Sequence, residues 1–459
     1  MVTLIENGLI VTMDPKRTII KDGAIVIEGD HILDVGEESE IKRKYKPSKK
    51  LNAKDKLILP GLIDAHAHLT EILHRGCEGN LSLIDWLTTR AWPLGGAVSE
   101  EDAKIATSLC CLEMLKSGTT CFVEPMLYSK RDFNGIAETI QEVGIRGVLA
   151  KALMGKVGYG LKEENLTRDL KEDSKSSLAE AIAMIKKWDG QAEGRIKVWL
   201  GPRVASACTE ELGRQVSEVA EEFHTGITLH FAEVREDTDQ IKVEHGRSPA
   251  EYLQRIGLLK ENVLLCHAIW LDPEDIDLLA ASGANVVHCP SSNLKLASGF
   301  AKIPEMLRKG IPVALGCDGG MANGCYDMFR EMKLTSLIHR GVTLDPLSIT
   351  AERVLEMATI KGARALSMED EIGSIEAGKK ADLIMIDLRK PHLVPLLNTV
   401  SNIVYSATGS DVDTVIINGK LIMQHRRVLT VDEEGILREA QSRAQTIVER
   451  TAVAKTWSR

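Results

Sequence analysis

The chain has 459 residues, of which 44% are hydrophobic, and a formal net charge of −9. This length supplies a large core and fits one barrel-sized domain with additions better than several small modules. Its 57 Lys and Arg residues are dispersed, so the concentrated basic surface that nucleic acids require is missing. No segment is long and apolar enough to span a membrane, and the first residues lack the pattern of a signal peptide, so we expect a cytoplasmic protein. The nine cysteines form no CxxC pair and are expected to be reduced thiols.

The two ends of the chain carry similar short segments. NGLIV follows Glu6, and NGKLI follows Ile417. Because Asn-Gly favours two-residue turns, both segments are predicted to be hairpin turns between short strands. We therefore expect the two chain ends to pair in one small β-domain.

Between these ends, short apolar runs alternate with helical patterns. In chain order the runs are LILPGLIDAH, TTCFVEP, RGVLAKAL, IKVWLGPR, ITLHFAE, VLLCHA, ANVVHCP and VALGCD. Continuous apolar runs indicate strands buried on both faces, and alternation with helices indicates a parallel sheet. Eight such units predict an α/β protein with a (β/α)8 barrel, whose functional site lies at the C-terminal ends of the strands.

Side chains that can bind a metal stand at the ends of several runs. The stretch LPGLIDAHAHL contains His66 and His68, which point to the same side if the chain is extended there. The fifth run carries His230, the sixth His267 and the eighth Asp318. A single histidine at such a place is usually structural. Five ligand-type residues on the catalytic edge of one barrel instead predict a metal site.

The types of ligand indicate which metal binds. Imidazole nitrogens with one carboxylate suit Zn²⁺, with Fe²⁺ or Mn²⁺ as alternatives. A catalytic metal of this kind keeps one position open for water and lowers the pKa of that water from about 16 toward 7. Hydroxide is then available at neutral pH, so hydrolysis is the predicted class of reaction.

Five motifs resemble those of the amidohydrolase superfamily: PGLIDAHAHL, HFAEV, LLCHA, CPSSNLKLASG and ALGCDGG. The similarity is to the branch that contains methylthioadenosine/S-adenosylhomocysteine deaminases, guanine and pterin deaminases and s-triazine hydrolases. GSIEAGKKADLIMIDL and DTVIINGKLI resemble the segments with which this family closes a β-sandwich beside its barrel. The resemblance implies sandwich segments at residues 1–57 and 369–430, a barrel at 58–368 and a C-terminal helix at 431–459. It also implies a homodimer or homotetramer, which is the habit of the family.

The resemblance assigns roles by position. His66, His68 and His230 correspond to the metal-binding histidines, and Asp318 corresponds to the aspartate that meets the metal or its water. Glu233 resembles the proton shuttle. Three residues after His230, its carboxylate can reach the same pocket, as a general acid/base must. The alternative is a solvated loop glutamate.

The implied reaction is hydrolytic deamination of an amino-substituted N-heterocycle of the purine, pterin or triazine type. Asp318 and Glu233 accept protons from the metal-bound water, and Glu233 protonates a ring nitrogen. His267 orients the hydroxide and stabilises charge on its oxygen, after which ammonia leaves. One metal ion is implied, because the fourth run ends in Arg203, whereas the binuclear branch has a bridging lysine at the end of that strand.

Two departures from the methylthioadenosine type of deaminase bear on the substrate. Those enzymes tend to have Gly-Pro-His where this chain has Gly-Pro-Arg203, and they place a ribose-binding glutamate where ungapped counting from His66 reaches Gly95. The planar fork of an arginine can donate two hydrogen bonds to a keto oxygen or a carboxylate. This favours an oxo-purine, pterin or hydroxy-triazine over adenine. The alternative is that Arg203 pairs with a structural carboxylate.

Further candidates follow the first and seventh runs. Trp86 could stack on a flat heterocycle, because indole offers a large rigid face, or it could belong to the core. Arg75 and Glu78 could contact the substrate or be solvated. Asn293 is predicted to cap a helix.

Three other functions stay open. The first is deamination of methylthioadenosine, S-adenosylhomocysteine or a similar nucleoside. The second is another hydrolysis, such as removal of chloride from a triazine or opening of a cyclic amide. Asp318 and Glu233 favour ammonia as the leaving group here, because an amine needs proton transfers that chloride does not. The third is an inactive barrel that binds a small heterocycle, which the complete set of ligand-type residues disfavours.

Overall fold

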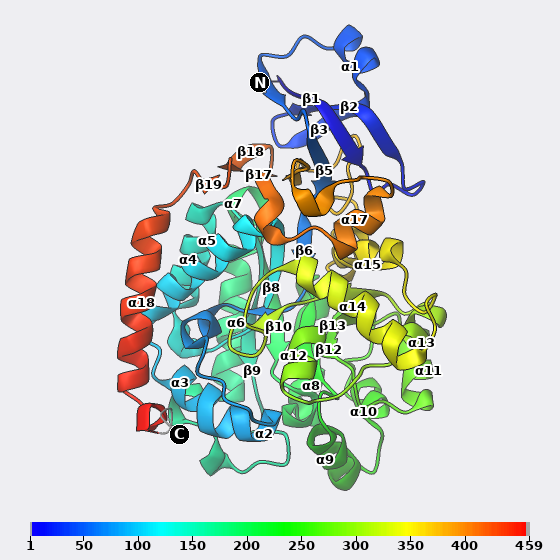
Figure 1. Cartoon of the computed structure of the whole chain (residues 1–459). Coiled ribbons are helices and arrows are strands. Elements are labelled where there is room, and N and C mark those ends of the chain that lie inside the picture. The colour runs from blue at the N-terminus through cyan, green and yellow to red at the C-terminus, as the bar shows by residue number, and fades with distance from the viewer. Residues whose placement is uncertain (1, 456–459) are drawn as a thin grey trace.

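The computed structural model describes residues 2–455. Figure 1 shows a barrel surrounded by helices, with a smaller sheet domain at one end and a long helix along one side. In the described part of the chain the strands form sheets of nine, eight and two strands. This is the α/β architecture that the alternating runs predicted.

The eight-stranded sheet is the barrel. Its strand order is β14-β13-β12-β11-β10-β9-β8-β6, and every pairing in it is parallel. The strands are β6 (Leu62–Asp64), β8 (Thr119–Leu127), β9 (Arg146–Leu153), β10 (Ile196–Pro202), β11 (Ile227–Phe231), β12 (Val263–His267), β13 (Asn285–His288) and β14 (Val313–Leu315). Seven of them lie within one of the eight predicted runs each, and β8 begins with the second run and continues two residues beyond it. Nearly all of their residues are buried, which is why they read as continuous apolar segments.

The barrel closes through short contacts between its first and last strands. The Ala65 N–H donates to the Leu315 carbonyl at 2.9 Å, and the Asp318 N–H donates to the His66 carbonyl at 2.7 Å. Beyond these contacts, β15 (Asp318–Gly319) pairs in parallel with β7 (Ala67–His68). The first and last predicted site motifs are therefore hydrogen-bonded neighbours.

Helices cover the outside of the barrel (Figure 1). They are α4 (Glu100–Lys116), α5 (Phe133–Val143), α6 (Ser174–Trp188), α8 (Glu210–Glu222), α9 (Arg235–His245), α10 (Pro249–Arg255), α11 (Pro273–Ser282), α12 (Pro290–Lys295), α13 (Ile303–Arg308), α14 (Met328–Thr343), α15 (Ala351–Met357) and α16 (Ile360–Ala365). Helix α4 shows the local signals that set such boundaries. Ser99 and Asp102 form a capping box at its start, and Gly118 follows its end with a φ of 89°, a conformation that glycine adopts without strain.

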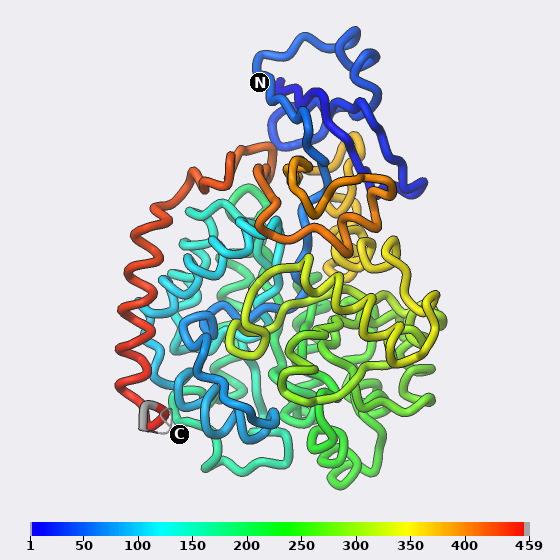
Figure 2. Tube along the Cα trace, in the orientation of Figure 1, coloured from blue at the N-terminus to red at the C-terminus, as the bar shows by residue number. Residues whose placement is uncertain are grey.

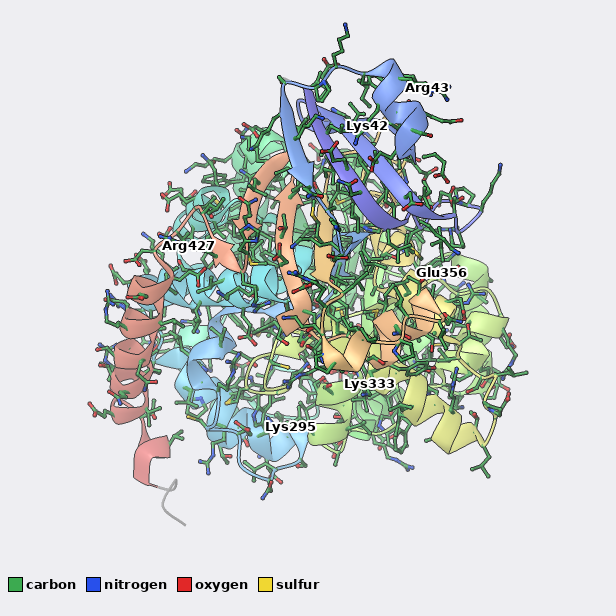
Figure 3. The ribbon with its side chains drawn as sticks, turned by 45° about the horizontal axis from the view of Figure 1, so that its top comes forward. Lys42, Arg43, Lys295, Lys333, Glu356 and Arg427 are labelled. Carbon is green, nitrogen blue, oxygen red and sulfur yellow. The ribbon has the colours of Figure 1, made fainter. Side chains whose placement is uncertain are left out.

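The nine-stranded sheet combines both ends of the chain. Its order is β19-β18-β17-β16-β5-β1-β2-β3, with β4 also paired to β1. The strands are β1 (Val2–Val11), β2 (Ile19–Glu28), β3 (His31–Glu37), β4 (Lys49–Asn52), β5 (Lys56–Pro60), β16 (Leu383–Asp387), β17 (Val412–Ile417), β18 (Lys420–Gln424) and β19 (Arg427–Val428). Figure 2 shows the blue N-terminal trace and the orange trace, which precedes the red C-terminal helix, meeting at one end of the barrel. Helix α1 (Glu38–Lys44), which carries Lys42 and Arg43 in Figure 3, packs on β2 and β3 of this sheet. Helix α17 (Thr399–Tyr405) follows β16 in the chain and packs against α14 and α15 of the barrel.

The two Asn-Gly segments differ in structure. Asn418 and Gly419 form the predicted hairpin turn between β17 and β18. The prediction for Asn7 and Gly8 is wrong, because they lie inside β1 at an irregularity in its pairing with β2. Asn7 has a φ of 65°, and a Cβ on Gly8 would lie 2.5 Å from a side-chain carbon of Ile58. The segment is therefore a bulge that lets β1 pack closely against β5.

A buried ion pair connects the barrel to the sheet domain. Arg146 begins β9, and its Nε lies 3.0 Å from Oδ2 of Asp382, just before β16. Both side chains are almost completely buried. The Arg146 guanidinium also donates to the Asn418 side chain in the hairpin turn. One guanidinium thus binds two parts of the sheet domain.

The long helix α18 (Glu433–Glu449) packs along α4 and the 3₁₀ helix η1 (Leu69–His74). Arg443 of α18 lies 3.0 Å from Asp102, the residue that caps α4. Within residues 2–455, no helix combines the length and the apolar character needed to cross a bilayer. All nine cysteines are free thiols, and eight of them are buried, as predicted.

Candidate active site

Four histidines and one aspartate meet at the C-terminal edge of the barrel strands. All five are at least nine-tenths buried. They lie just after β6, in β7, in β11, at the end of β12 and in β15: His66, His68, His230, His267 and Asp318. This is the edge at which barrel enzymes carry their functional groups. His267 and Asp318 both have positive φ values, 77° and 68°, and such strained backbone is concentrated at functional sites.

The spacing of the donor atoms fits a tetrahedral metal ion. Nε2 of His68 lies 3.2 Å from Nε2 of His230. Oδ1 of Asp318 lies 3.3 Å from Nε2 of His68 and 3.6 Å from Nε2 of His66. Zinc bound to imidazole at about 2.0–2.1 Å in a tetrahedron holds its ligand atoms about 3.3 Å apart. Neither ring nitrogen of the buried His66 has a hydrogen-bond partner among the described residues, so this side chain requires a ligand such as a metal ion.

Neighbouring groups orient two of the rings. Nδ1 of His230 lies 2.6 Å from the Arg203 carbonyl, and Nδ1 of His267 lies 2.9 Å from Oδ1 of Asn293. Such contacts fix a ring so that its other nitrogen faces the metal. The prediction that Asn293 caps a helix is wrong, because it lies within α12 and binds His267.

The charges around the histidines suit a cation. Burial lowers the pKa of His66 to about 4 and that of His230 well below its usual value, so both rings are neutral and offer a lone pair. Burial also lowers the pKa of His68, but Asp318 and Glu124 outweigh it and raise that pKa well above the usual value. The carboxylates of Asp318 and Glu124, which favour a proton on His68, would attract a metal ion to the same place because both carry negative charge.

Glu233 lies beside His267 at this site. Its Oε2 atom is 3.7 Å from Nε2 of His267, and its side chain is almost fully buried. Burial raises the pKa of Glu233 to about 7, in the range where a carboxyl can both accept and donate a proton near neutral pH. Asp237 holds the preceding turn by accepting from the Ala232 N–H at 2.9 Å. A solvated loop glutamate, the alternative for Glu233, does not match this burial.

Two small cavities adjoin the cluster. The first has a volume of ≈ 40 Å³, and its histidine, acidic and arginine lining residues are His68, Glu71, Arg203, His230, Glu233 and Asp318. The second, of ≈ 50 Å³, shares five lining residues with the first, namely His68, Glu71, Leu87, Trp92 and Met126. Ligand pockets usually measure about 300–1,000 Å³. Part of the lining of both cavities comes from the consecutive helical turns α2 (Leu83–Trp86), η2 (Leu87–Ala91) and α3 (Trp92–Gly96).

Arg203 lies in the wall of the first cavity. It is 3% exposed. Its guanidinium carbon is 4.6 Å from the centre of the Trp92 ring and 5.9 Å from that of Tyr159. Nη1 donates to the Val157 carbonyl at 3.3 Å, while the buried Nη2 has no partner. Among the described residues it forms no ion pair, so the alternative of a structural carboxylate partner has no support.

The other predicted substrate contacts divide into two groups. Trp86 lines the first cavity, and its buried Nε1 has no partner among the described residues. Arg75 pairs with Glu113 and faces a groove beside α18. Glu78 lies 2.8 Å from Lys295, whose side chain lies at the surface away from the sheet domain (Figure 3). Neither Arg75 nor Glu78 is among the described residues that line the two cavities.

Sequence reasoning missed several residues near the cluster. Glu124 is the next-to-last residue of the second predicted run and accepts from the Leu69 N–H at 2.7 Å, with its other oxygen 3.7 Å from Nδ1 of His68. Its place near the end of that run was a usable signal. Trp92 and Tyr159 line the first cavity, but nothing in their local sequence indicates this. Glu71, which lines both cavities, stands only three residues after His68.

Gly95 lies at the second cavity. Its carbonyl accepts from the Arg131 guanidinium, and Arg131 itself is buried. Counted from the first histidine, this is the position where nucleoside deaminases of the methylthioadenosine type carry their ribose-binding glutamate. No side chain extends from it into the cavity.

Residues 57–422 match the family model described as Amidohydrolase family. The chain belongs to the amidohydrolase family. A 5-methylthioadenosine/S-adenosylhomocysteine deaminase from Pelotomaculum thermopropionicum is 37% identical over 97% of this chain and 99% of its own. A 5'-deoxyadenosine deaminase from Methanosarcina mazei is also 37% identical, over 97% and 98%. A zinc-bound adenosine deaminase from Xanthomonas campestris has a TM-score of 0.90 and 29% identity, covering 97% of this chain and 98% of its own.

These findings confirm the predicted family and class of enzyme. This amidohydrolase is a hydrolase that acts on carbon–nitrogen bonds of cyclic amidines. Its buried histidine cluster is a potential metal site, and zinc occupies the related structure. The identity of its substrate is a separate question.

Proposed function

We propose that this amidohydrolase is a zinc-dependent deaminase that releases ammonia from an amino-substituted N-heterocycle carrying a keto oxygen, of the oxo-purine or pterin type. The observation that carries the proposal is the buried, unpartnered Nη2 of Arg203 in the same cavity wall as Glu233. A buried guanidinium donor without a partner is costly unless a ligand supplies an acceptor.

His66, His68, His230 and Asp318 would hold the zinc ion. Bound there, zinc would lower the pKa of a water molecule and so make a nucleophile available at neutral pH. Asp318 has its carboxylate within 3.6 Å of two histidines, where it can accept the proton of the attacking water. The neutral rings of His66 and His230 need no deprotonation before binding the metal.

Glu233 moves protons between water and the ring. With a pKa of about 7, its carboxyl takes a proton at one step and gives it to a ring nitrogen at the next, which makes the amine-bearing carbon more electrophilic. His267 lies 3.7 Å from the Glu233 carboxyl group and stabilises negative charge on the attacking oxygen. The amine leaves as ammonia after it receives a proton from the same set of groups.

Arg203 and Trp86 recognise the heterocycle. The Arg203 fork donates to the keto oxygen, and its stacking on Trp92 holds the fork in place. The indole of Trp86 gives a flat wall and one further N–H donor. The enclosed site excludes bulk water, which strengthens each of these hydrogen bonds.

A 5'-substituted adenosine is the second candidate substrate. The relatives named as methylthioadenosine and 5'-deoxyadenosine deaminases favour it, because they are 37% identical over nearly the full chain. Gly95 and Arg203 disfavour it, since adenine has no keto oxygen and Gly95 offers no carboxylate to a ribose.

The test is ammonia release by the zinc-loaded protein from adenine, guanine, isoguanine, pterin, amino-triazines, methylthioadenosine, S-adenosylhomocysteine and 5'-deoxyadenosine. We expect turnover of keto-bearing free heterocycles, and turnover slower by about 10²-fold to 10⁴-fold in a Glu233→Gln protein that retains its zinc. Turnover confined to nucleosides would replace the proposal with the second candidate. Chloride release from a chlorotriazine, without ammonia from any compound, would refute deamination.

A further inference from the structure

Glu71 has an unusual position at the active site. It lies in η1, three residues after His68, and lines both cavities beside the histidine cluster. Its Oε2 atom is buried and has no hydrogen-bond partner among the described residues. The mechanism above gives this carboxyl group no task.

Gly319 provides the space for the Glu71 carboxyl group. A Cβ atom on Gly319 would lie 1.8 Å from Oε2 and 2.6 Å from Cδ of Glu71, so any side chain there would displace the carboxyl group. Gly319 directly follows Asp318, and β15 pairs with β7 at His68. The carboxyl group is therefore seated against the backbone of the metal-binding strands.

Glu71 stands outside the two candidate metal-binding groups of the described residues. The described groups of histidine and acidic side chains that are close enough to share an ion are His66 with His68 and His230, and His66 with His267 and Asp318. Glu71 belongs to neither. An enclosed carboxylate oxygen without a partner is unfavourable, and an ionised carboxylate can only accept hydrogen bonds. A donor from a bound molecule would satisfy it.

We propose that Glu71 is a substrate-binding residue that accepts a hydrogen bond from an N–H group of the heterocycle. The same cavity presents unpartnered donors on Arg203 and Trp86. An acceptor on Glu71 together with donors on Arg203 and Trp86 calls for a ring that has an N–H on one edge and a keto oxygen on another. The substrate is thus an amino-heterocycle that contains a lactam, –NH–C(=O)–. This inference rests on the proposed function and narrows it.

Binding of unreactive ligands tests the inference apart from catalysis. We would measure affinities of the zinc-loaded protein for xanthine, 1-methylxanthine and 3-methylxanthine by isothermal titration calorimetry. Methylation of the recognised N–H should weaken binding about tenfold to hundredfold, the range for a hydrogen bond to a charged group. The Glu71→Ala protein should bind xanthine correspondingly more weakly. In that variant the methylated xanthine should bind as well as xanthine, because the substitution and the methylation remove the same hydrogen bond.

Two variants separate recognition from folding. Gly319→Ala should abolish the same discrimination by displacing the carboxyl group while Glu71 remains. Glu101→Gln, at an exposed glutamate in the first turn of α4, should leave it unchanged. A lower Tm and lower zinc content in Glu71→Ala with an intact methylation penalty would assign Glu71 a structural role and overturn the proposal.

A second pair of ligands tests whether the donor to Glu71 is a ribose hydroxyl instead of a ring N–H. A ribose hydroxyl is also a donor to a carboxylate, so inosine and 2'-deoxyinosine are compared in parallel. If Glu71→Ala removes a preference for inosine instead of one among xanthines, the lactam assignment is wrong. Failure of wild-type protein to bind any xanthine would overturn it as well. Glu71-dependent xanthine binding without ammonia release from any amino-heterocycle would refute the proposed function and leave this inference standing.

Discussion

Replacement of Arg203 by methionine tests how the site distinguishes keto-bearing heterocycles. Methionine keeps most of the side-chain volume but has no donor. The change removes the unpartnered Nη2, the contact from Nη1 to the Val157 carbonyl and the stacking on Trp92. Only the loss of Nη2 depends on which substrate is bound. Loss of the other two contacts should change kcat/KM by the same factor for every substrate.

The expected size follows from the lost hydrogen bond. A hydrogen bond from a charged group contributes about 1.5–3 kcal/mol, which corresponds to about 10-fold to 150-fold in kcat/KM at 1.4 kcal/mol per tenfold. Because Arg203 is 3% exposed, water cannot replace the guanidinium donor, so we expect the effect within this range. The orphaned Val157 carbonyl lowers stability and turnover for every substrate and cancels from a ratio.

Matched pairs of substrates isolate that ratio. Guanine and 2-aminopurine differ by the keto oxygen at one position, and isoguanine and adenine differ by it at another. Ammonia release gives kcat/KM for each compound with the wild-type and Arg203→Met proteins. The ratio should fall about 10-fold to 150-fold for the pair whose oxygen Arg203 binds. An unchanged ratio for both pairs would remove Arg203 from substrate recognition.

The remaining predictions concern catalysis and stability. His230→Ala should lose zinc and activity together, as measured by metal content and ammonia release. Glu233→Gln should keep zinc and lose about 10²-fold to 10⁴-fold in kcat. Normal turnover by Glu233→Gln would refute its role as the proton shuttle. Asp382→Asn leaves the Arg146 charge buried without its partner and should cost about 3–5 kcal/mol in urea unfolding, and a loss below 1 kcal/mol would contradict the pair's role. Burial raises the pKa of Asp102, but hydrogen bonds from Ser99 and from Arg443 of α18 outweigh burial and hold that pKa below its usual value. The ionised Asp102 carboxylate therefore stabilises the folded protein at neutral pH, and this contribution is lost as the pH falls through the folded-state pKa. Asp102→Asn should therefore lower the Tm at neutral pH and flatten its decline in acid, and parallel Tm curves would contradict this.

Local sequence was sufficient for the barrel and its metal-binding edge. Strands buried on both faces need continuous apolar runs, and eight such runs became the eight parallel strands. His66, His68, His230, His267 and Asp318 stand at strand ends, and parallel strands in a barrel bring those ends to one edge. Their convergence follows from order along the chain alone.

Partners from distant parts of the chain could not be predicted in this way. Arg75 and Glu78 stand in the expected loop, but Glu113 and Lys295 bind them elsewhere. Asn293 is a residue type that commonly caps helices, but here its side chain binds and orients His267. In each case the contact that forms depends on which group the fold brings within reach.

The sequence by itself determined the barrel, the family and the set of residues able to hold a metal, because these depend on periodicity and on strand order. Only the tertiary structure decided which polar atoms lack a partner at the site. Whether Arg203 is paired, and whether Glu71 has room against Gly319, depends on packing across the barrel between segments about 45 to 250 residues apart. Hydrogen bonds of this kind form within a few tenths of an ångström, a precision that no local pattern of residues specifies.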